Sequence, residues 1–222
     1  MIKRNTTVEA MRILTPLAAV VLLAGLSVEI ISGDNIHFTG WYLGVLPVVC
    51  LVFIVDFFVD CATNPDPERR FWRHLPFLLL SIPYLNIIRI CGAEMTRAQA
   101  MAVGLVTMLR AFMAMFVVVR WMVRGSGPRR LFYAYIFTVA VFTYLSALVF
   151  YDYEIHVNPH LTSFGNAVWW AGMGVTTVGA AIFPVTTMGK IFAVLLPMVG
   201  MLMFPIFTVY VTDIYTRKKE RS

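Results

Sequence analysis

One interrupted apolar stretch, residues 163–189, constrains most strongly what this chain can fold into. It reads SFGNAVWWAGMGVTTVGAAIFPVTTMG and lies between two apolar segments that are each long enough to cross a bilayer. Its glycines and its proline prevent it from crossing as one helix, and non-helical backbone at membrane depth is tolerated only where it is buried or lines a cavity. We therefore predict a re-entrant segment: a short helix enters, and an extended run, Thr176–Gly179, leaves with its carbonyls facing an ion path.

The composition of the rest of the chain is that of a polytopic membrane protein. Of its 222 residues, 59% are hydrophobic and 14% are charged, which is far from the composition of a soluble domain. A membrane-spanning helix needs about 20 predominantly apolar residues. By that criterion we expect an all-α membrane protein with six transmembrane helices at residues 11–32, 41–61, 74–91, 99–123, 131–151 and 190–214.

The net charge of +6 is a signal of topology, and we expect no nucleic-acid partner. With six spans, the basic clusters all fall on the same side of the membrane: Lys3/Arg4/Arg12, Arg69/Arg70/Arg73, Arg124/Arg129/Arg130 and Arg217/Lys218/Lys219/Arg221. Because cytoplasmic loops carry the excess of Lys and Arg, both termini are expected in the cytoplasm. We expect an integral protein of the plasma membrane, in contact with lipid.

A specific resemblance appears in the interrupted stretch. Trp169 and Trp170 are followed by five residues and then by Thr176–Gly179, with Pro184 and an apolar helix beyond. This arrangement resembles the pore helix and selectivity filter of voltage-gated-type potassium channels, which are six-helix, tetrameric cation channels. In that family the two Trp residues support the filter.

The resemblance implies two domains and a homotetramer. Residues 1–124 would form a four-helix voltage-sensor-like domain, and residues 125–222 a two-helix pore domain with a re-entrant pore loop. The glycine- and proline-containing segment Gly125–Arg130 marks the boundary. Four subunits would close one ring of filter carbonyls.

The filter of this chain departs from the family pattern in its outer half. The carbonyls of Thr177, Val178 and Gly179, with the Thr177 hydroxyl, would replace the hydration shell of K+. Where the family continues with Tyr and Gly, this chain has Ala180 and Ala181. An alanine cannot pack as the Tyr does, and its Cβ disfavours the backbone conformation of the family glycine. We expect the inner ion sites to persist, the outer sites to be lost or widened, and K+ to be weakly preferred over Na+; a collapsed filter is the alternative.

The first domain has acids but few sensor charges. Asp56 and Asp60 lie four residues apart in the second span, and acids inside a span usually face a bundle interior or a cavity. In the fourth span, Arg110 is the one charged residue of its third-residue register. Steep gating needs three or four charges per subunit, so voltage sensing is expected to be weak or absent. A sensing role for Arg110 and a structural pair with Asp56 both remain open.

Two further features of the second domain have more than one interpretation. Gly200 and Pro205 in the last span are either a gating hinge, as the resemblance implies, or a packing glycine with a static kink. Glu154 or Asp152, just after the fifth span, either supports the back of the pore helix, as the resemblance implies, or is an ordinary solvated acid.

These features favour a channel over other classes of protein. The sequence contains no nucleophile motif or cluster of His, Cys and Asp, so we expect neither an enzyme nor a cofactor or metal beyond permeant K+ and Na+. A non-conducting modulatory subunit, assembled with other channel subunits, is the main alternative. A secondary transporter is less favoured, because such proteins usually have paired broken helices in internal repeats and this sequence has one such interruption.

Overall fold

The computed structural model of the protein is helical over the residues that it describes, which are 6–32, 40–63, 67–90, 97–123 and 128–219. The chain divides into two compact units, Met1–Val118 and Val119–Ser222, and each is described by itself. An all-α membrane protein is consistent with this structure. The domain boundary expected at residues 124 and 125 stays a prediction, because part of that linker lies outside the described residues.

The first unit contains four helices and most of a fifth: α1 (Thr6–Ser32), α2 (Gly40–Thr63), α3 (Pro67–Leu80), α4 (Tyr84–Ile90) and α5 (Arg97–Val123). α1 packs along α2, and α2 also contacts α3 and α4. Hydroxyl side chains within the apolar helices donate hydrogen bonds to backbone carbonyls of the same helix. The Thr15 hydroxyl donates to the Met11 carbonyl at 2.8 Å, and the Ser27 hydroxyl donates to the Leu23 carbonyl at 2.7 Å. These bonds satisfy polar groups that lipid cannot.

The third expected span, residues 74–91, is not one continuous helix. α3 ends at Leu80, and α4 begins at Tyr84 after a short irregular segment. Pro83 lies in this segment, where it has no N–H to donate and its ring opposes continuation of the helix. The apolar run therefore contains two helical pieces.

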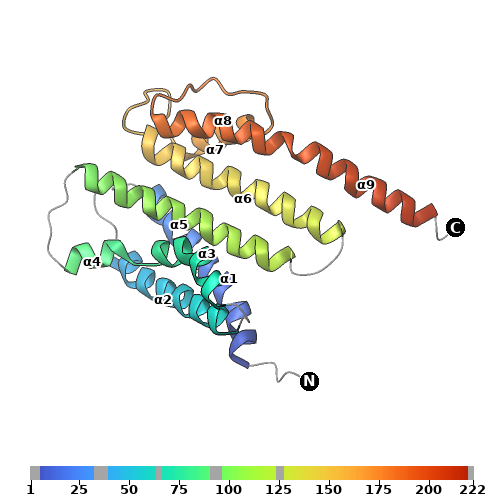
Figure 1. Ribbon diagram of the computed structural model, residues 1–222. Helices are drawn as coiled ribbons and strands as arrows, with labels where there is room; N and C mark the ends of the chain where they lie inside the picture. The colour runs from blue at the N-terminus through green and yellow to red at the C-terminus, as the bar shows by residue number, and fades with distance from the viewer. Residues whose placement is uncertain (1–5, 33–39, 64–66, 91–96, 124–127, 220–222) are drawn as a thin grey trace. The chain divides into compact units, whose positions relative to one another are not determined.

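The second unit is built around α6 (Pro128–Glu154), which packs against the three helices that follow it: α7 (Phe164–Val175), α8 (Thr187–Met201) and α9 (Met203–Lys219). α7 also packs against α8. Figure 1 shows α6 in yellow beside α7 and α8. This arrangement holds the short helix α7 between two long ones.

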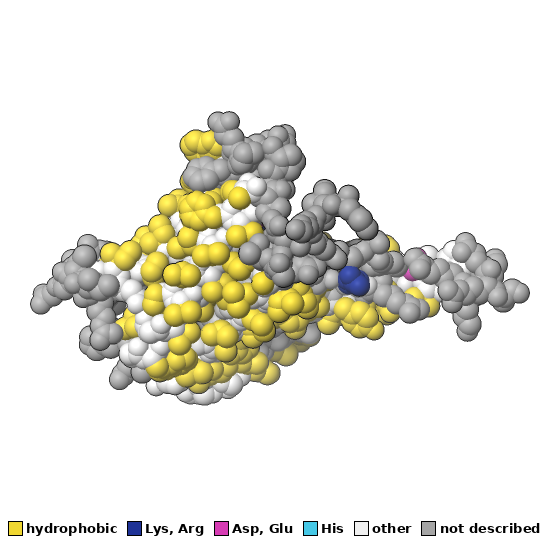
Figure 2. Space-filling model, turned by 90° about the horizontal axis from the view of Figure 1, so that it is seen from below, with side chains coloured by type: hydrophobic (Ala, Val, Ile, Leu, Met, Phe, Trp, Pro, Cys, Tyr) yellow, Lys and Arg dark blue, Asp and Glu magenta, His cyan; other side chains and the backbone are white. Residues whose placement is uncertain are grey.

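The described residues contain five helical stretches that are long and apolar enough to cross a membrane: Ile13–Ser32, Gly40–Ala62, Gly104–Met122, Phe132–Glu154 and Thr187–Ile214. All five lie where the sequence predicts spans, and the sixth expected span is the interrupted pair α3 and α4. Figure 2 shows hydrophobic side chains over much of the described surface on the face that it presents. These stretches support an integral membrane protein.

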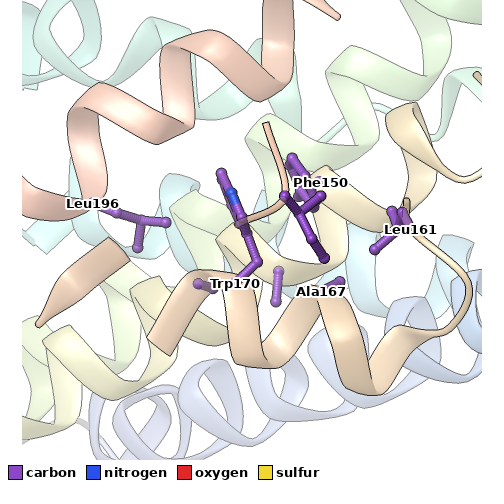
Figure 3. Close-up of a cluster of buried hydrophobic side chains, with 8 residues drawn as sticks. Phe150, Leu161, Ala167, Trp170 and Leu196 are labelled. Carbon is purple, nitrogen blue, oxygen red and sulfur yellow. The ribbon is translucent and has the colours of Figure 1, made fainter. Parts of the chain in front are cut away.

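A cluster of buried side chains joins α6, α7 and α8. Phe150 of α6 and Trp170 of α7 stack face to face, with ring centroids 3.7 Å apart and planes 9° apart (Figure 3). The other members of the cluster are Ala147, Leu161, Ala167, Ala171, Ile182 and Leu196. In a membrane this packing stabilises helices mainly through van der Waals contact. The cluster fixes where α7 ends, and so fixes the segment that follows it.

Candidate functional site

α7 is a short helix with well-defined ends. At its start, the Ser163 hydroxyl accepts a hydrogen bond from the Asn166 N–H at 3.3 Å, which is N-cap geometry. At its end, the Thr176 hydroxyl donates to the Gly172 carbonyl at 2.8 Å. Twelve residues make a helix about 18 Å long, whereas a bilayer core is about 30 Å thick. The helix is too short to cross.

Residues 176–179, the TTVG turn, wrap the end of α7. The N–H groups of Val178 and Gly179 both donate to the Met173 carbonyl, at 3.1 and 3.2 Å. Thr177 and Gly179 have positive φ angles of 62° and 84°. The start of this segment is therefore a turn and not the extended run that the sequence suggests. The physical reason is that its N–H groups find acceptors at the C-terminal end of the helix, where carbonyls lack intrahelical partners.

The carbonyl groups of the TTVG turn remain available to a ligand. Across the described part of the chain, no group donates a hydrogen bond to the carbonyls of Thr177, Val178 or Gly179. All residues of the turn are exposed, and Val178 is 69% exposed. A β-branched residue in the left-handed conformation, such as Thr177, costs about 1–2 kcal/mol. Such strain is typical of functional sites, and here it accompanies carbonyls that can coordinate a cation.

Beyond the turn, the chain returns toward the core of its own unit. Ala180 packs partly against the buried cluster, Ala181 is exposed, and Ile182 is a buried member of the cluster. Sequence reasoning missed the anchoring role of Ile182. The available signal was a β-branched apolar residue directly after two alanines.

Glu154, at the end of α6, holds the segment that leads into α8. Its carboxylate is fully buried and accepts from the N–H of Val185 at 2.9 Å and from the N–H and hydroxyl of Thr186 at 2.6 and 2.7 Å. It also accepts from the side-chain amide of Asn158 at 2.7 Å, and that amide donates to the Phe183 carbonyl at 2.9 Å. Glu154 is therefore not an ordinary solvated acid: it braces the segment that leads into α8. Support of the back of α7 by Glu154 stays a prediction.

The start of α8 approaches this carboxylate closely. The Thr186 hydroxyl accepts from the Gly189 N–H at 3.0 Å and caps the helix. A Cβ atom at Gly189 would lie 2.5 Å from Glu154 Oε1 and 2.8 Å from the Cβ of Pro184. Residue 189 must therefore be a glycine for the brace to form as it does.

The two Trp residues of α7 have different surroundings. Trp170 is buried on Phe150, whereas the neighbouring side chain of Trp169 is 47% exposed. Trp170 thus belongs to the core of its own unit, and the Trp169 side chain lies partly exposed outside that core. A role for the pair in supporting the filter stays a prediction.

Gly200 lies where α8 crosses the end of α7. A Cβ atom built at Gly200 would overlap the carbonyl oxygen of Val175, the last residue of α7. The helix backbones can approach this closely only because residue 200 has no side chain. The structure therefore gives Gly200 a packing role, and the hinge role stays a prediction.

The last span is interrupted just after Gly200. α8 ends at Met201 and α9 begins at Met203, with Pro205 in the first turn of α9. Carbonyls in the last turn of a helix lack intrahelical donors. One of them, that of Val199, accepts from the Tyr135 hydroxyl of α6 at 2.9 Å.

The sensor-like residues lie in the first unit. Asp56 and Asp60 are half-buried on α2, and Arg110 of α5 is buried, with 2% of its surface exposed. The Arg110 guanidinium donates to the carbonyls of Leu80 and Ile82 at 2.8 and 2.5 Å, at the break between α3 and α4. Its pairing with Asp56 stays a prediction. Sequence reasoning did not foresee the backbone partners.

Comparison with known proteins agrees with the architecture of the second unit. No curated protein matches the chain. Residues 136–217, which begin in α6 and end in α9, match a family model described as "Ion channel". The match spans α7, the TTVG turn and α8, and it supports an ion channel, which is a non-enzymatic class of membrane protein.

Proposed function

We propose that this protein is one subunit of a homotetrameric channel for monovalent cations in the plasma membrane, similar to potassium channels. The observation that carries the proposal is the TTVG turn at the end of α7. Its N–H groups donate to carbonyls of α7, its four residues are exposed, and the carbonyls of Thr177, Val178 and Gly179 have no donor within the described residues. Carbonyls in this state can replace the hydration shell of a cation.

We propose an assembly of several copies because of what one copy lacks, and the number four comes from the resemblance to tetrameric channels. One copy supplies one turn, whereas coordination of an ion on an axis needs a ring of carbonyls from several copies. Only 6% of the most apolar part of the α8–α9 span is buried, against 33–50% in the other four spans. Exposed side chains such as Val194, Met198 and Met201 recur at helical spacing on this span. Other copies, lipid and the pore itself would cover this surface.

The permeant ions would bind at the inner half of the filter. The carbonyls of Thr177, Val178 and Gly179, together with the Thr177 hydroxyl, would hold K+. We infer that Ala180 and Ala181 do not form the outer sites. Ala180 packs partly against the buried cluster, and the Cβ of Ala181 disfavours the conformation of the family glycine. We infer weak discrimination of K+ over Na+.

Voltage sensitivity would be weak or absent, because Arg110 is the one charged residue in its third-residue register along the proposed fourth span. One elementary charge gains about 2.3 kcal/mol per 100 mV, and steep gating uses three or four charges per subunit. We also propose that each subunit has six spans, that its first four helical spans form a sensor-like domain, and that both termini lie in the cytoplasm.

Cation flux into liposomes that contain the purified protein tests the proposal. The wild-type protein should carry K+, and Gly179→Ala should abolish the flux because alanine disfavours the φ of 84° at this residue. Gly104→Ala is a matched control, since a Cβ there has open space within 4 Å. Equal flux in both variants would contradict a conduction role for the TTVG turn.

The partial burial of Ala180 also favours a second candidate, a modulatory subunit that does not conduct by itself. That function predicts no flux from the protein alone and altered currents when it is assembled with a conducting channel. Discrete single-channel currents would exclude it, and they would also exclude a secondary transporter.

A further inference from the structure

The break between α3 and α4 exposes backbone carbonyls inside an apolar segment. Pro83 has no N–H, so the regular helical hydrogen bonds cannot continue across it. Some of the carbonyls find partners nearby in the sequence. The Tyr84 hydroxyl donates to the Leu79 carbonyl at 2.8 Å, and the Tyr84 N–H donates to the Ile82 carbonyl at 2.9 Å. In a membrane, every remaining carbonyl needs a donor from the protein.

Arg110 supplies the missing donors from a distant part of the sequence. Its Nε donates to the Leu80 carbonyl at 2.8 Å, and its Nη2 donates to the Ile82 carbonyl. Within the described part of the chain, Arg110 is the one donor to the Leu80 carbonyl. The side chain is 2% exposed, so water does not replace these bonds.

We propose that Arg110 is a positioning residue that caps the break between α3 and α4, and that its charge stays fixed there when the membrane potential changes. Movement of the guanidinium along the membrane would leave the Leu80 carbonyl without a donor among the described residues, and would leave the Ile82 carbonyl with the Tyr84 N–H alone. Loss of donors in apolar surroundings opposes such movement. This role belongs to the first unit and does not depend on the proposed conduction path.

The chemistry of Arg fits this role in a specific way. A guanidinium is planar and directs its N–H groups along fixed, diverging directions, whereas a lysine ammonium has a single nitrogen. Two nitrogens of Arg110 reach two carbonyls that are two residues apart in sequence. Citrulline is a neutral analogue that retains both of these N–H donors. It therefore separates the hydrogen bonds of Arg110 from its charge.

Solid-state NMR of the full chain in lipid bilayers can observe the cap directly. Ile82–Pro83 is the one Ile-Pro bond in the sequence. Protein labelled with carbonyl-¹³C isoleucine and ¹⁵N proline therefore gives a single signal for the Ile82 carbonyl, and its chemical shift reports hydrogen bonding at that oxygen. The variants are Arg110→Met and Arg110→citrulline. Arg120→Met is the matched control, since Arg120 is an exposed residue of the same helix.

The cap predicts that Arg110→Met moves the Ile82 signal, while Arg110→citrulline and Arg120→Met leave it in place. If the Met variant cannot be purified, Arg110→Lys should move the signal, because one nitrogen replaces two. An unmoved signal in Arg110→Met, or in this Lys variant, would overturn the cap. Where currents are measurable, citrulline should leave the voltage dependence unchanged. A loss of voltage dependence with citrulline would show that the charge moves, and would overturn the proposal even if the protein conducts normally.

Discussion

Single residues decide the geometry of the chain between α6 and α8. The Glu154 carboxylate accepts hydrogen bonds from four donors in the segment between α6 and α8. Gly189 has no side chain and so leaves room for the Glu154 carboxylate. Thr177 takes a left-handed backbone conformation so that the following N–H groups reach the end of α7. This part of the chain is therefore held by specific hydrogen bonds, and they can form because residue 189 has no Cβ atom.

Glu154→Gln should destabilise the second unit. A hydrogen bond to a charged group contributes about 1.5–3 kcal/mol, and the Gln amide would direct N–H groups at donors that now face a carboxylate. We expect a clearly lower melting temperature of the detergent-solubilised protein, measured by intrinsic fluorescence. Asp152→Asn, in which a half-buried acid two residues away is neutralised, is the control. Similar melting of the two variants would contradict the bracing role.

Gly200→Ala should be strongly destabilising, because the new Cβ would overlap the Val175 carbonyl. Overpacking of a close contact typically costs about 1–3 kcal/mol, even though alanine favours a helix more than glycine does. Thermal unfolding compared with Gly104→Ala measures the effect. If Gly200→Ala is as stable as wild type, α8 does not approach α7 as closely as the structure has it.

At the scale of elements, interruptions of apolar helices recur, and other parts of the protein supply the missing hydrogen bonds. Arg110 donates to the α3–α4 break, and Tyr135 donates at the α8–α9 break. Two hydrogen bonds from a charged donor, at about 1.5–3 kcal/mol each, together exceed the roughly 2.3 kcal/mol that 100 mV supplies to one charge. A break capped in this way is a fixed feature of the fold.

Tyr135→Phe should loosen the α8–α9 break. It removes the hydrogen bond to the Val199 carbonyl, which is worth about 1 kcal/mol and corresponds to roughly fivefold faster local opening. Hydrogen–deuterium exchange of peptides that cover residues 196–208 measures this opening. The control is Tyr133→Phe, because Tyr133 is exposed on the same helix. Unchanged exchange in Tyr135→Phe would mean that the hydroxyl does not stabilise the break.

The sequence predicted some of these elements and not others. Apolar length located five spans, and the glycines and proline of residues 163–189 located the short helix and the segment after it. The α3–α4 break was missed, although Pro83 signalled it, because the surrounding residues remain apolar. The partners of Arg110 and the turn at Thr177 were also missed. They depend on which carbonyls another helix leaves unpaired, and residue spacing does not contain that information.

At the scale of the whole molecule, the proposed channel needs more than one copy of the second unit. The α8–α9 span is apolar and mostly exposed, and the carbonyls of one TTVG turn cannot surround an ion. The protein purified in mild detergent should therefore have the mass of four chains by light scattering, after subtraction of the detergent. A monodisperse monomer that still carries ion flux would contradict the proposed ring.

The reversal potential of the reconstituted protein, with K+ on one side and Na+ on the other, tests the central claim most directly. A filter with inner sites at Thr177–Gly179 and no outer sites at Ala180 and Ala181 predicts real current that reverses near zero. Reversal near the K+ equilibrium potential would contradict the loss of the outer sites. The absence of current at every voltage would contradict conduction by this protein alone.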